Sequence, residues 1–207
     1  YKNYDPYGGG RSSARETAGR VIAGAIAKQY LAVRGPSVEA NLIQVGETQG
    51  ELDVLQAEIL KVKQKGNSIG GVIEVVANGV PVGWCEPTYE KLDARLAYAL
   101  MGLNAVKAVE IGDGINVVGR FGSENNDELT PEGFKSNSSG GVLGGISTGQ
   151  QVVARVHIKP TASIFKPQKT IDREGHPHVL DLRGRHDPCV ALRAVVIVEA
   201  IVASVLF

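Results

Sequence analysis

The amino-acid sequence predicts a single α+β domain, and three observations support this. Segments of helical periodicity alternate with short segments of strand character, and sequential parallel βαβ units are not clearly marked. The chain of 207 residues is long enough for a sizeable core. Glycine makes up 26 of these residues, well above the usual share of about 7%, while the hydrophobic content of 43% is ordinary. This composition indicates tight turns and close backbone approaches rather than disorder.

The first half of the chain is expected to form two helices and two strands. Ser13 and Glu16 have the spacing of a capping box, which begins a helix that Gly35 and Pro36 end. A second, amphipathic helix carries lysines in its last turn, where they complement the helix dipole. Alternation of apolar residues predicts the strands. The expected helices cover residues 13–32 and 52–65, and the expected strands cover residues 38–45 and 72–77.

The second half is expected to be richer in strands and turns. Thr88 is a plausible N-cap for a helix, and Asp113-Gly114 is a hairpin signal between two strands. A polar segment that follows is expected to be a mobile loop, with an ordinary solvated loop as the alternative. The expected elements are a helix over 89–101, strands over 105–111 and 115–118, a loop over 122–135, a glycine-dense turn over 140–149, a strand over 151–158 and a helix after residue 188.

Charge and composition exclude several classes of protein. The 22 basic and 22 acidic residues give zero formal charge, which argues against a nucleic-acid or polyanion binder. Cys85 and Cys189 form neither a disulfide framework nor a zinc site, so a reducing compartment, the cytoplasm, is expected. The histidines have no metal-like spacing, and no metal is expected. The apolar run over residues 194–207 is shorter than the roughly 20 residues that cross a membrane, so no membrane partner is expected.

The stretch Gly8-Gly9-Gly10-Arg11-Ser12-Ser13 runs directly into the first helix and predicts an anion site. Glycines let the backbone approach a ligand closely, and the N–H groups at the start of a helix favour negative charge. The guanidinium groups of Arg11 and Arg15 suit phosphate or carboxylate. The alternative is an ordinary capped helix with solvated arginines, which a single glycine-rich turn does not exclude.

Four segments together resemble chorismate synthases, and they occur in the order of that family. The resemblance covers nearly the whole chain. The segments are Gly8 to Thr17 (GGGRSSARET), Gly66 to Gly71 (GNSIGG), Ser136 to Gln150 (SNSSGGVLGGISTGQ) and Gly184 to Cys189 (GRHDPC). The family often has Asp at the position of Asn67, so a role that needs a carboxylate there is in doubt. The resemblance implies an α+β sandwich of sheets with helices packed between them.

The resemblance also implies a chemistry. Chorismate synthases convert 5-enolpyruvylshikimate 3-phosphate to chorismate and phosphate with reduced flavin mononucleotide (FMN) and no net redox change. Such a site holds two phosphorylated ligands. It therefore requires guanidinium groups that can each make two parallel hydrogen bonds, and many main-chain N–H donors. The family suggests a homo-oligomer, a tetramer. The sequence leaves open whether the protein itself reduces its flavin with NADP.

Site residues carry over from the family position by position. The resemblance places Arg11, Ala14, Arg15 and Arg185 on the substrate, and Ser13, Ala14, Asn104, Gly145, Lys159, Ser163 and Arg185 on the flavin. From the sequence alone, Lys159 could instead cap a strand end, and Asn104 could serve packing.

Asp187 is the residue we expect to handle a proton, because a carboxylate near a flavin can take or pass one. The alternative is that Asp187 caps the last helix, with Pro188 at the first helical position. His186 beside it also invites a catalytic role, but the family does not always have histidine there, so it is a weaker candidate.

Parts of the family pattern are missing from this sequence. The chain begins at Tyr1, lacks the family's N-terminal segment with its catalytic histidines, and lacks a loop near Glu47 and Thr48. It is therefore expected to be a partial, inactive chain of an enzyme. A non-catalytic binding or oligomerisation module is the alternative. The enzyme is favoured if Arg15 and Arg185 converge beside residues 140–149. A nucleotide-phosphate transferase is disfavoured, because no phosphate-binding loop ending in Gly-Lys-Ser/Thr is present.

Overall fold

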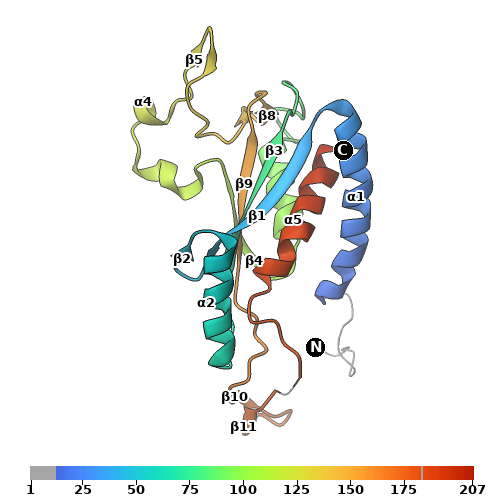
Figure 1. Cartoon of the computed structure of the whole chain (residues 1–207), viewed down its shortest axis with the longest axis vertical. Coiled ribbons are helices and arrows are strands. Elements are labelled where there is room, and N and C mark those ends of the chain that lie inside the picture. Colours follow the sequence, from blue (N-terminus) through green and yellow to red (C-terminus); the bar gives the residue numbers. More distant parts are fainter. Residues whose placement is uncertain (1–12, 183) are drawn as a thin grey trace.

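The computed structural model describes residues 13–182 and 184–207, and its centre is one five-stranded antiparallel sheet (Figure 1). The strand order is β2-β1-β3-β9-β4. Every neighbouring pair is antiparallel, and helices lie between strands in the sequence, so the α+β class is confirmed. The strands are β1 (Ser37–Val45), β2 (Thr48–Gln49), β3 (Gly71–Asn78), β4 (Val106–Ile111) and β9 (Val152–Ile158).

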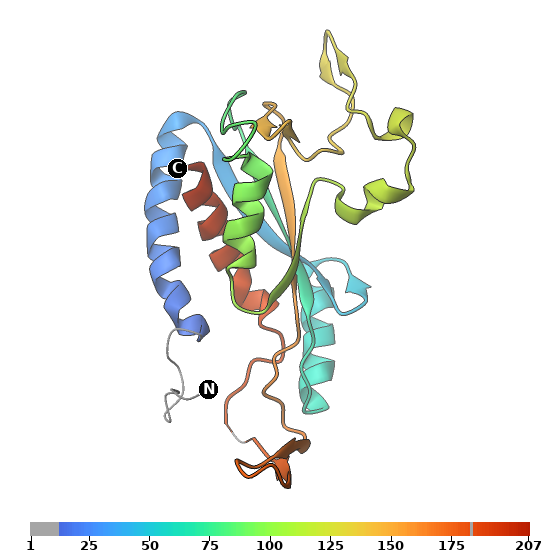
Figure 2. The same cartoon turned by 180° about the vertical axis from the view of Figure 1, so that it is seen from behind.

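Helices α1, α3 and α5 lie over one face of this sheet, with α5 between the other two, and α2 packs on β1 and β2 (Figures 1 and 2). Helix α5 packs on β1 and β3 and also contacts α1 and α3. Its sequence is apolar on nearly all sides, as expected for a helix buried between a sheet and other helices. Its one acidic residue, Glu199, pairs with Lys28 of α1 and accepts a hydrogen bond from Ala40 N. The helices are η1 (Ala14–Glu16), α1 (Thr17–Arg34), α2 (Leu52–Gln64), α3 (Leu92–Met101) and α5 (Ala191–Leu206).

Strand alternation builds the core as the sequence predicts. In β1, Val38, Ala40 and Leu42 are buried, whereas Ser37, Glu39 and Asn41 between them are exposed. The apolar residues of β9 alternate in the same way. Side chains of a strand point alternately to the two faces, so these residues form one apolar face under the helices. Full burial of each aliphatic side chain contributes roughly 1.5–3 kcal/mol.

The sheet has two ends that matter below. At the lower end in Figure 1, Gly71 is paired with Val45 on one side and with Ile158 on the other. The starts of α1 and α5 lie at this end (Figure 1). At the upper end, Ser37 pairs with Asn78, and Ala77 pairs with Val152. Strand β9 therefore connects the two ends.

Short helices and two-stranded hairpins lie at these two ends of the sheet (Figure 1). The hairpin β10–β11 extends from the lower end, and the others lie toward the upper end. They are η2 (Gly114–Gly119), α4 (Gly122–Asn125), β5 (Leu129–Thr130), β6 (Gly133–Phe134), β7 (Val142–Leu143), β8 (Ile146–Ser147), β10 (Gln168–Ile171) and β11 (Pro177–Leu180). No helix in the described part of the chain is long and apolar enough to cross a membrane.

The helical start predicted at Ser13 is confirmed, but without the full capping box, and the start predicted at Thr88 was wrong. The capping box does not form, because Glu16 pairs with Arg20 (3.0 Å) instead of folding back onto Ser13. Among the described residues, Ser13 Oγ accepts from Arg15 N alone, at 3.5 Å, and a short 3₁₀ turn precedes α1. Thr88 is not the N-cap of α3, which begins at Leu92. Leu92 N donates to a main-chain oxygen far away in the sequence, so a distant segment replaces the local cap.

The strand predicted over residues 115–118 was also wrong, since η2 occupies this segment. Gly112 and Gly114 adopt positive φ angles of 59° and 58° and turn the chain out of the sheet. Arg120 Nη1 then pairs with Asp113 Oδ2 at 2.5 Å and closes the turn. The segment expected to be a loop over 122–135 contains α4 and the β5–β6 hairpin.

Helix α1 approaches α5 closely at Gly24, which gives a stability prediction. A Cβ built on Gly24 would lie 2.4 Å from Ala200 Cα, whereas a Cβ on Gly19 of the same helix would meet nothing within 4 Å. We expect Gly24→Ala to lower the free energy of unfolding by about 1–3 kcal/mol, because the helices must separate. Gly19→Ala, the matched control, should raise it by roughly 0.5–1 kcal/mol. Urea unfolding measures both, and equal effects would contradict the close packing.

Candidate functional site

Segments from four parts of the sequence meet at the lower end of the sheet. They are residues 66–70, 102–105, 159–165 and 184–190, and we call them the lower-end loops. Hydrogen bonds that join them run from Lys159 N to Ala105 O (3.0 Å), from Phe165 N to Gly66 O (3.0 Å), from Ile69 N to Pro188 O (2.8 Å) and from Ser68 Oγ to Thr161 O (2.6 Å). Each segment leaves or enters a core strand or helix, so the sheet and α5 fix where the loops begin.

The start of α1 is tied to the same end. Arg20 Nη1 donates to Gly102 O at 3.2 Å, next to the loop that carries Asn104. Ser13, Ala14 and Arg15 therefore stand close to this end, at the first turn before α1. Most of the site residues predicted from the sequence thus share one end of the sheet, namely Ser13, Ala14, Arg15, Asn104, Lys159, Ser163, Arg185 and Asp187. Arg11 lies outside the described residues.

The electrostatics of the lower end favour an anion. Helices α1 and α5 both begin here, so the positive ends of two helix dipoles point to the same region (Figure 1). Arg15, Lys159 and Arg185 are exposed, and none of them forms an ion pair with any described residue. Cations without partners beside two helix N-termini suit phosphate and carboxylate groups. Within the described residues, no cluster of His, Cys, Asp and Glu could hold a metal ion.

Two polar atoms at the lower end are buried without a hydrogen-bond partner among the described residues. They are Thr161 Oγ1 and His186 Nε2. The His186 ring lies 5.3 Å from the ring of Phe165, centroid to centroid. A buried polar atom without a partner is costly, and a ligand can supply the missing bond. Sequence reasoning did not select Thr161 and gave His186 little weight, because burial of single atoms is not visible in a sequence.

Asp187 is oriented by an ion pair and does not cap the last helix. Its Oδ1 lies 3.0 Å from Arg193 Nε. Helix α5 begins at Ala191, and the N-cap position belongs to Val190. The capping alternative for Asp187 and Pro188 was therefore wrong, because the chain makes a further turn before α5. Arg193 is exposed and Asp187 is half-buried, so the pair stabilises the fold little, but it orients one carboxylate oxygen.

Gly145 lies away from the other predicted residues. It joins β7 to β8, and its carbonyl accepts the hydrogen bond from Leu92 N (2.8 Å) at the start of α3. Asn104 follows the opposite end of α3, which has 10 residues and is about 15 Å long. The glycine-dense segment is thus at the upper end, and the expected convergence with Arg15 and Arg185 is not found within one chain.

Asp127 clamps the segment that leads to Gly145. Its Oδ1 accepts from Ser136 Oγ (2.6 Å) and Ser138 N (2.7 Å), and its Oδ2 accepts from Ser139 N (2.9 Å). Desolvation alone would raise the pKa of Asp127, but the hydrogen bonds from these serines outweigh it and hold the pKa below its ordinary value. The polar segment over 122–135 is thus anchored at its centre, a feature that the sequence did not reveal.

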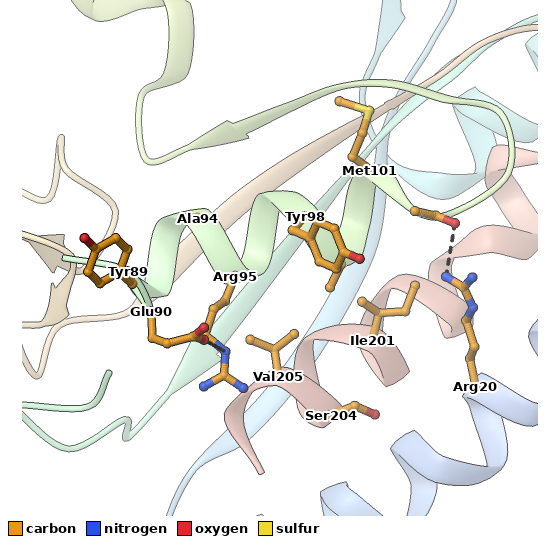
Figure 3. Close-up of a pocket in the computed structure, with 12 residues that line it drawn as sticks. Arg20, Tyr89, Glu90, Ala94, Arg95, Tyr98, Met101, Ile201, Ser204 and Val205 are labelled. Atoms are coloured by element: carbon orange, nitrogen blue, oxygen red, sulfur yellow. Dashed lines mark hydrogen bonds and ion pairs between the residues drawn. The ribbon is translucent and has the colours of Figure 1, made fainter. Parts of the chain in front are cut away.

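A large cavity in the described part of the chain lies elsewhere, between α1, α3 and α5 (Figure 3). Its volume is about 1090 Å³, and Arg20, Tyr98, Met101, Ile201 and Val205 line it. Figure 3 shows the bond from Arg20 to Gly102 at its edge. None of the predicted site residues lines this cavity.

Comparisons with known proteins agree on one family. The family model described as Chorismate synthase matches residues 1–207. The chorismate synthase of Wolinella succinogenes is 52% identical over 221 residues, which cover 98% of this chain and 61% of that protein. A crystal structure of chorismate synthase matches with a TM-score of 0.76 and 29% identity, over 94% of this chain and 62% of the other. The chain therefore spans less than two thirds of the length of these relatives.

The Asp127 clamp makes stability depend on pH. The folded-state pKa of Asp127 is depressed, so its contribution is present above the unfolded-state pKa and is lost as pH falls through the folded-state pKa. We expect Asp127→Asn to lower the free energy of unfolding by about 1–2 kcal/mol at pH 7, since charge-assisted bonds are lost. The difference from the wild type should shrink between about pH 5 and pH 2. Glu132→Gln, an exposed change in the same segment, is the control. A difference that is constant with pH would refute the clamp.

Proposed function

Because the chain belongs to the chorismate synthase family, we propose that it forms part of a lyase that converts 5-enolpyruvylshikimate 3-phosphate to chorismate and phosphate with reduced FMN. One observation carries the proposal. Three cations from separate segments, Arg15, Lys159 and Arg185, form no ion pair with any described residue and stand at the end of the sheet where two helices begin. A substrate with one phosphate and two carboxylates, beside a flavin phosphate, needs such a concentration of positive charge.

The residues present at the lower end fit both ligands. Arg15 and Arg185, with the backbone at Ala14 and with Arg11 by resemblance, would bind the substrate's anionic groups. Ser13, Asn104, Lys159, Ser163 and Arg185 would hold the flavin. Thr161 lies between two of these flavin positions in the sequence. Its hydroxyl has no hydrogen-bond partner among the described residues, and it would give the flavin one more hydrogen bond. When bound, the reduced flavin supplies electron density to the reaction and is not consumed, since the elimination involves no net redox change.

The elimination releases phosphate from one carbon and a proton from another, so a nearby group must accept or relay a proton. We assign this role to Asp187. Arg193 holds Oδ1 at 3.0 Å, which fixes the carboxylate and leaves Oδ2 available for the proton. His186 Nε2, which is buried and has no hydrogen-bond partner among the described residues, is a second group that could hold a proton or bond to an anionic oxygen.

The position of Gly145 supports an oligomer. If Gly145 contacts the flavin, one chain cannot supply both Gly145 and Lys159, because α3 and β9 separate them. A second copy could present its glycine-dense segment to the lower end of the first. We therefore propose a homo-oligomer with shared sites, and the family resemblance suggests a tetramer.

The alternative function, a non-catalytic binding or oligomerisation module, is favoured by the separation of Gly145 from the arginines within one chain. At the lower end, the cations without an ion pair and the buried atoms without a hydrogen bond, counted among the described residues, favour the enzyme. We propose that this chain alone is inactive, because the family's catalytic histidines are not in its sequence.

Cys85 and Cys189 are free thiols, which fits a reducing compartment, and we propose the cytoplasm. We propose reduced NADP as the source of electrons for the flavin.

Flavin binding tests the function. FMN should bind this chain, measured by fluorescence quenching, and more tightly with the enolpyruvyl substrate present. Lys159→Gln should weaken binding about tenfold because a cation is lost, and Lys63→Gln, an exposed lysine on α2, should leave it unchanged. In the full-length protein, Asp187→Ala should lower turnover at least about 100-fold without changing the flavin Kd. Binding that is insensitive to Lys159 would count against the site.

Mixing variants tests the shared site. In the full-length protein, Arg185→Ala and Gly145→Val should each abolish activity, the latter because a side chain at φ 86° must displace Lys91. Co-expression of the two should restore roughly a quarter of wild-type activity, since a mixed pair contains one intact site. Gly145→Ala replaces Gly145→Val if circular dichroism shows misfolding. Two copies of the Arg185→Ala chain are the control. No recovery in mixed oligomers would contradict sharing.

A further inference from the structure

The turn formed by residues 66–71, the GNSIGG turn, belongs to the lower-end loops, but the site described above gives it no function. It was one of the segments that the sequence singled out, yet none of its residues was assigned to a ligand. We infer that Ser68 is a positioning residue that holds the flavin-binding segment against the segment of Asp187. The inference rests on the proposed function.

Two successive residues of the turn bind two segments that are distant in the sequence. Ser68 Oγ donates to Thr161 O at 2.6 Å, and Ile69 N donates to Pro188 O at 2.8 Å. Thr161 lies between Lys159 and Ser163, and Pro188 directly follows Asp187. The turn is thus the element that joins the expected flavin contacts to the expected proton-handling group.

A third bond strengthens the connection. Gly66 O accepts from Phe165 N at 3.0 Å, so the turn holds the flavin-binding segment at both its middle and its end. The Phe165 ring contacts the His186 ring, which lies beside Asp187. The two segments therefore meet each other at one side and the turn at the other.

The base of the turn is fixed to the sheet. A Cβ on Gly70 would lie 2.5 Å from Ile158 O, and a Cβ on Gly71 would lie 2.8 Å from Gln44 O. Only glycine permits these approaches to the main chain of β9 and β1. Because the turn cannot shift relative to the sheet, it can hold the two segments in a set position.

Ser68 acts through other residues and not on the ligand itself. Its side chain is half-buried, and its hydroxyl proton is used by the main-chain oxygen of Thr161. Removing this hydroxyl leaves the charges of Lys159 and Asp187 unchanged but releases the segment between them. A loss of affinity would then come from the cost of ordering that segment when the ligand binds.

The experiment compares three serine variants in FMN binding. Ser68→Ala should raise the flavin Kd about tenfold, and Ser68→Thr, which keeps the hydroxyl, should restore it. Ser204→Ala is the matched control, because Ser204 Oγ also donates to a main-chain oxygen, Ala200 O at 2.8 Å, near the other end of α5. In the double variant with Lys159→Gln, the loss should be smaller than the product of the single losses, since both act through one segment.

A second measurement needs no ligand. Without flavin, Ser68→Ala should speed amide hydrogen exchange in residues 161–165 several-fold more than in β3. If Ser68 had only a general structural role, Ser68→Ala would lower protection from amide hydrogen exchange throughout the fold. In the double variant, the two losses of flavin affinity would then simply multiply. Unchanged flavin Kd, a multiplicative double variant or unchanged exchange would each overturn the inference. Failure of the wild type to bind flavin would instead refute the proposed function, and the exchange result would still decide the role of Ser68.

Discussion

The contact between Gly24 and Ala200 sets how closely α1 can lie to α5, and much of the candidate site depends on it. The two helices run in the same direction and begin at the same end of the sheet. Parallel helices that pack this closely bring two positive dipole ends together, an arrangement that is unfavourable unless negative charge lies nearby. The backbone of these two helices alone therefore makes the lower end of the sheet favourable for an anion, without any contribution from the side chains of the site.

Glycine serves this fold mainly by allowing backbones to touch. Gly112 and Gly140 lie so close that a Cβ on either would fall within 2.5 Å of the other's main chain. Gly70 and Gly71 allow the same closeness at the opposite end of the sheet. The glycine-rich segments that look like ligand loops in the sequence thus also lock loops onto strands. This double use explains why glycine is abundant in this chain.

Local sequence patterns correctly predicted elements of two kinds. In one kind the hydrogen-bonding partners are near in the sequence, and in the other buried and exposed side chains alternate regularly. The strands β1 and β9 and the helix α5 follow from apolar periodicity, because burial on one side leaves a regular trace in the sequence. The start of α3 was missed because its cap is Gly145 O, about 50 residues away along the chain, and no local signal encodes such a partner. The same limit applies to the site. Resemblance selected Lys159 and Asp187, but the burial of Thr161 Oγ1 depends on the three-dimensional arrangement of segments that periodicity cannot place.

Strand β9 has a consequence for how the chain can vary in length. It has seven residues and is about 20 Å long. The glycine-dense segment with Gly145 precedes it, and Lys159 follows it. Deleting one residue from β9 would turn every later side chain to the opposite face and pull the two ends out of register. The tip of the β5–β6 hairpin can gain or lose residues without such a penalty. Insertions and deletions should therefore accumulate at that tip during divergence, while β9 acts as a spacer of constant length.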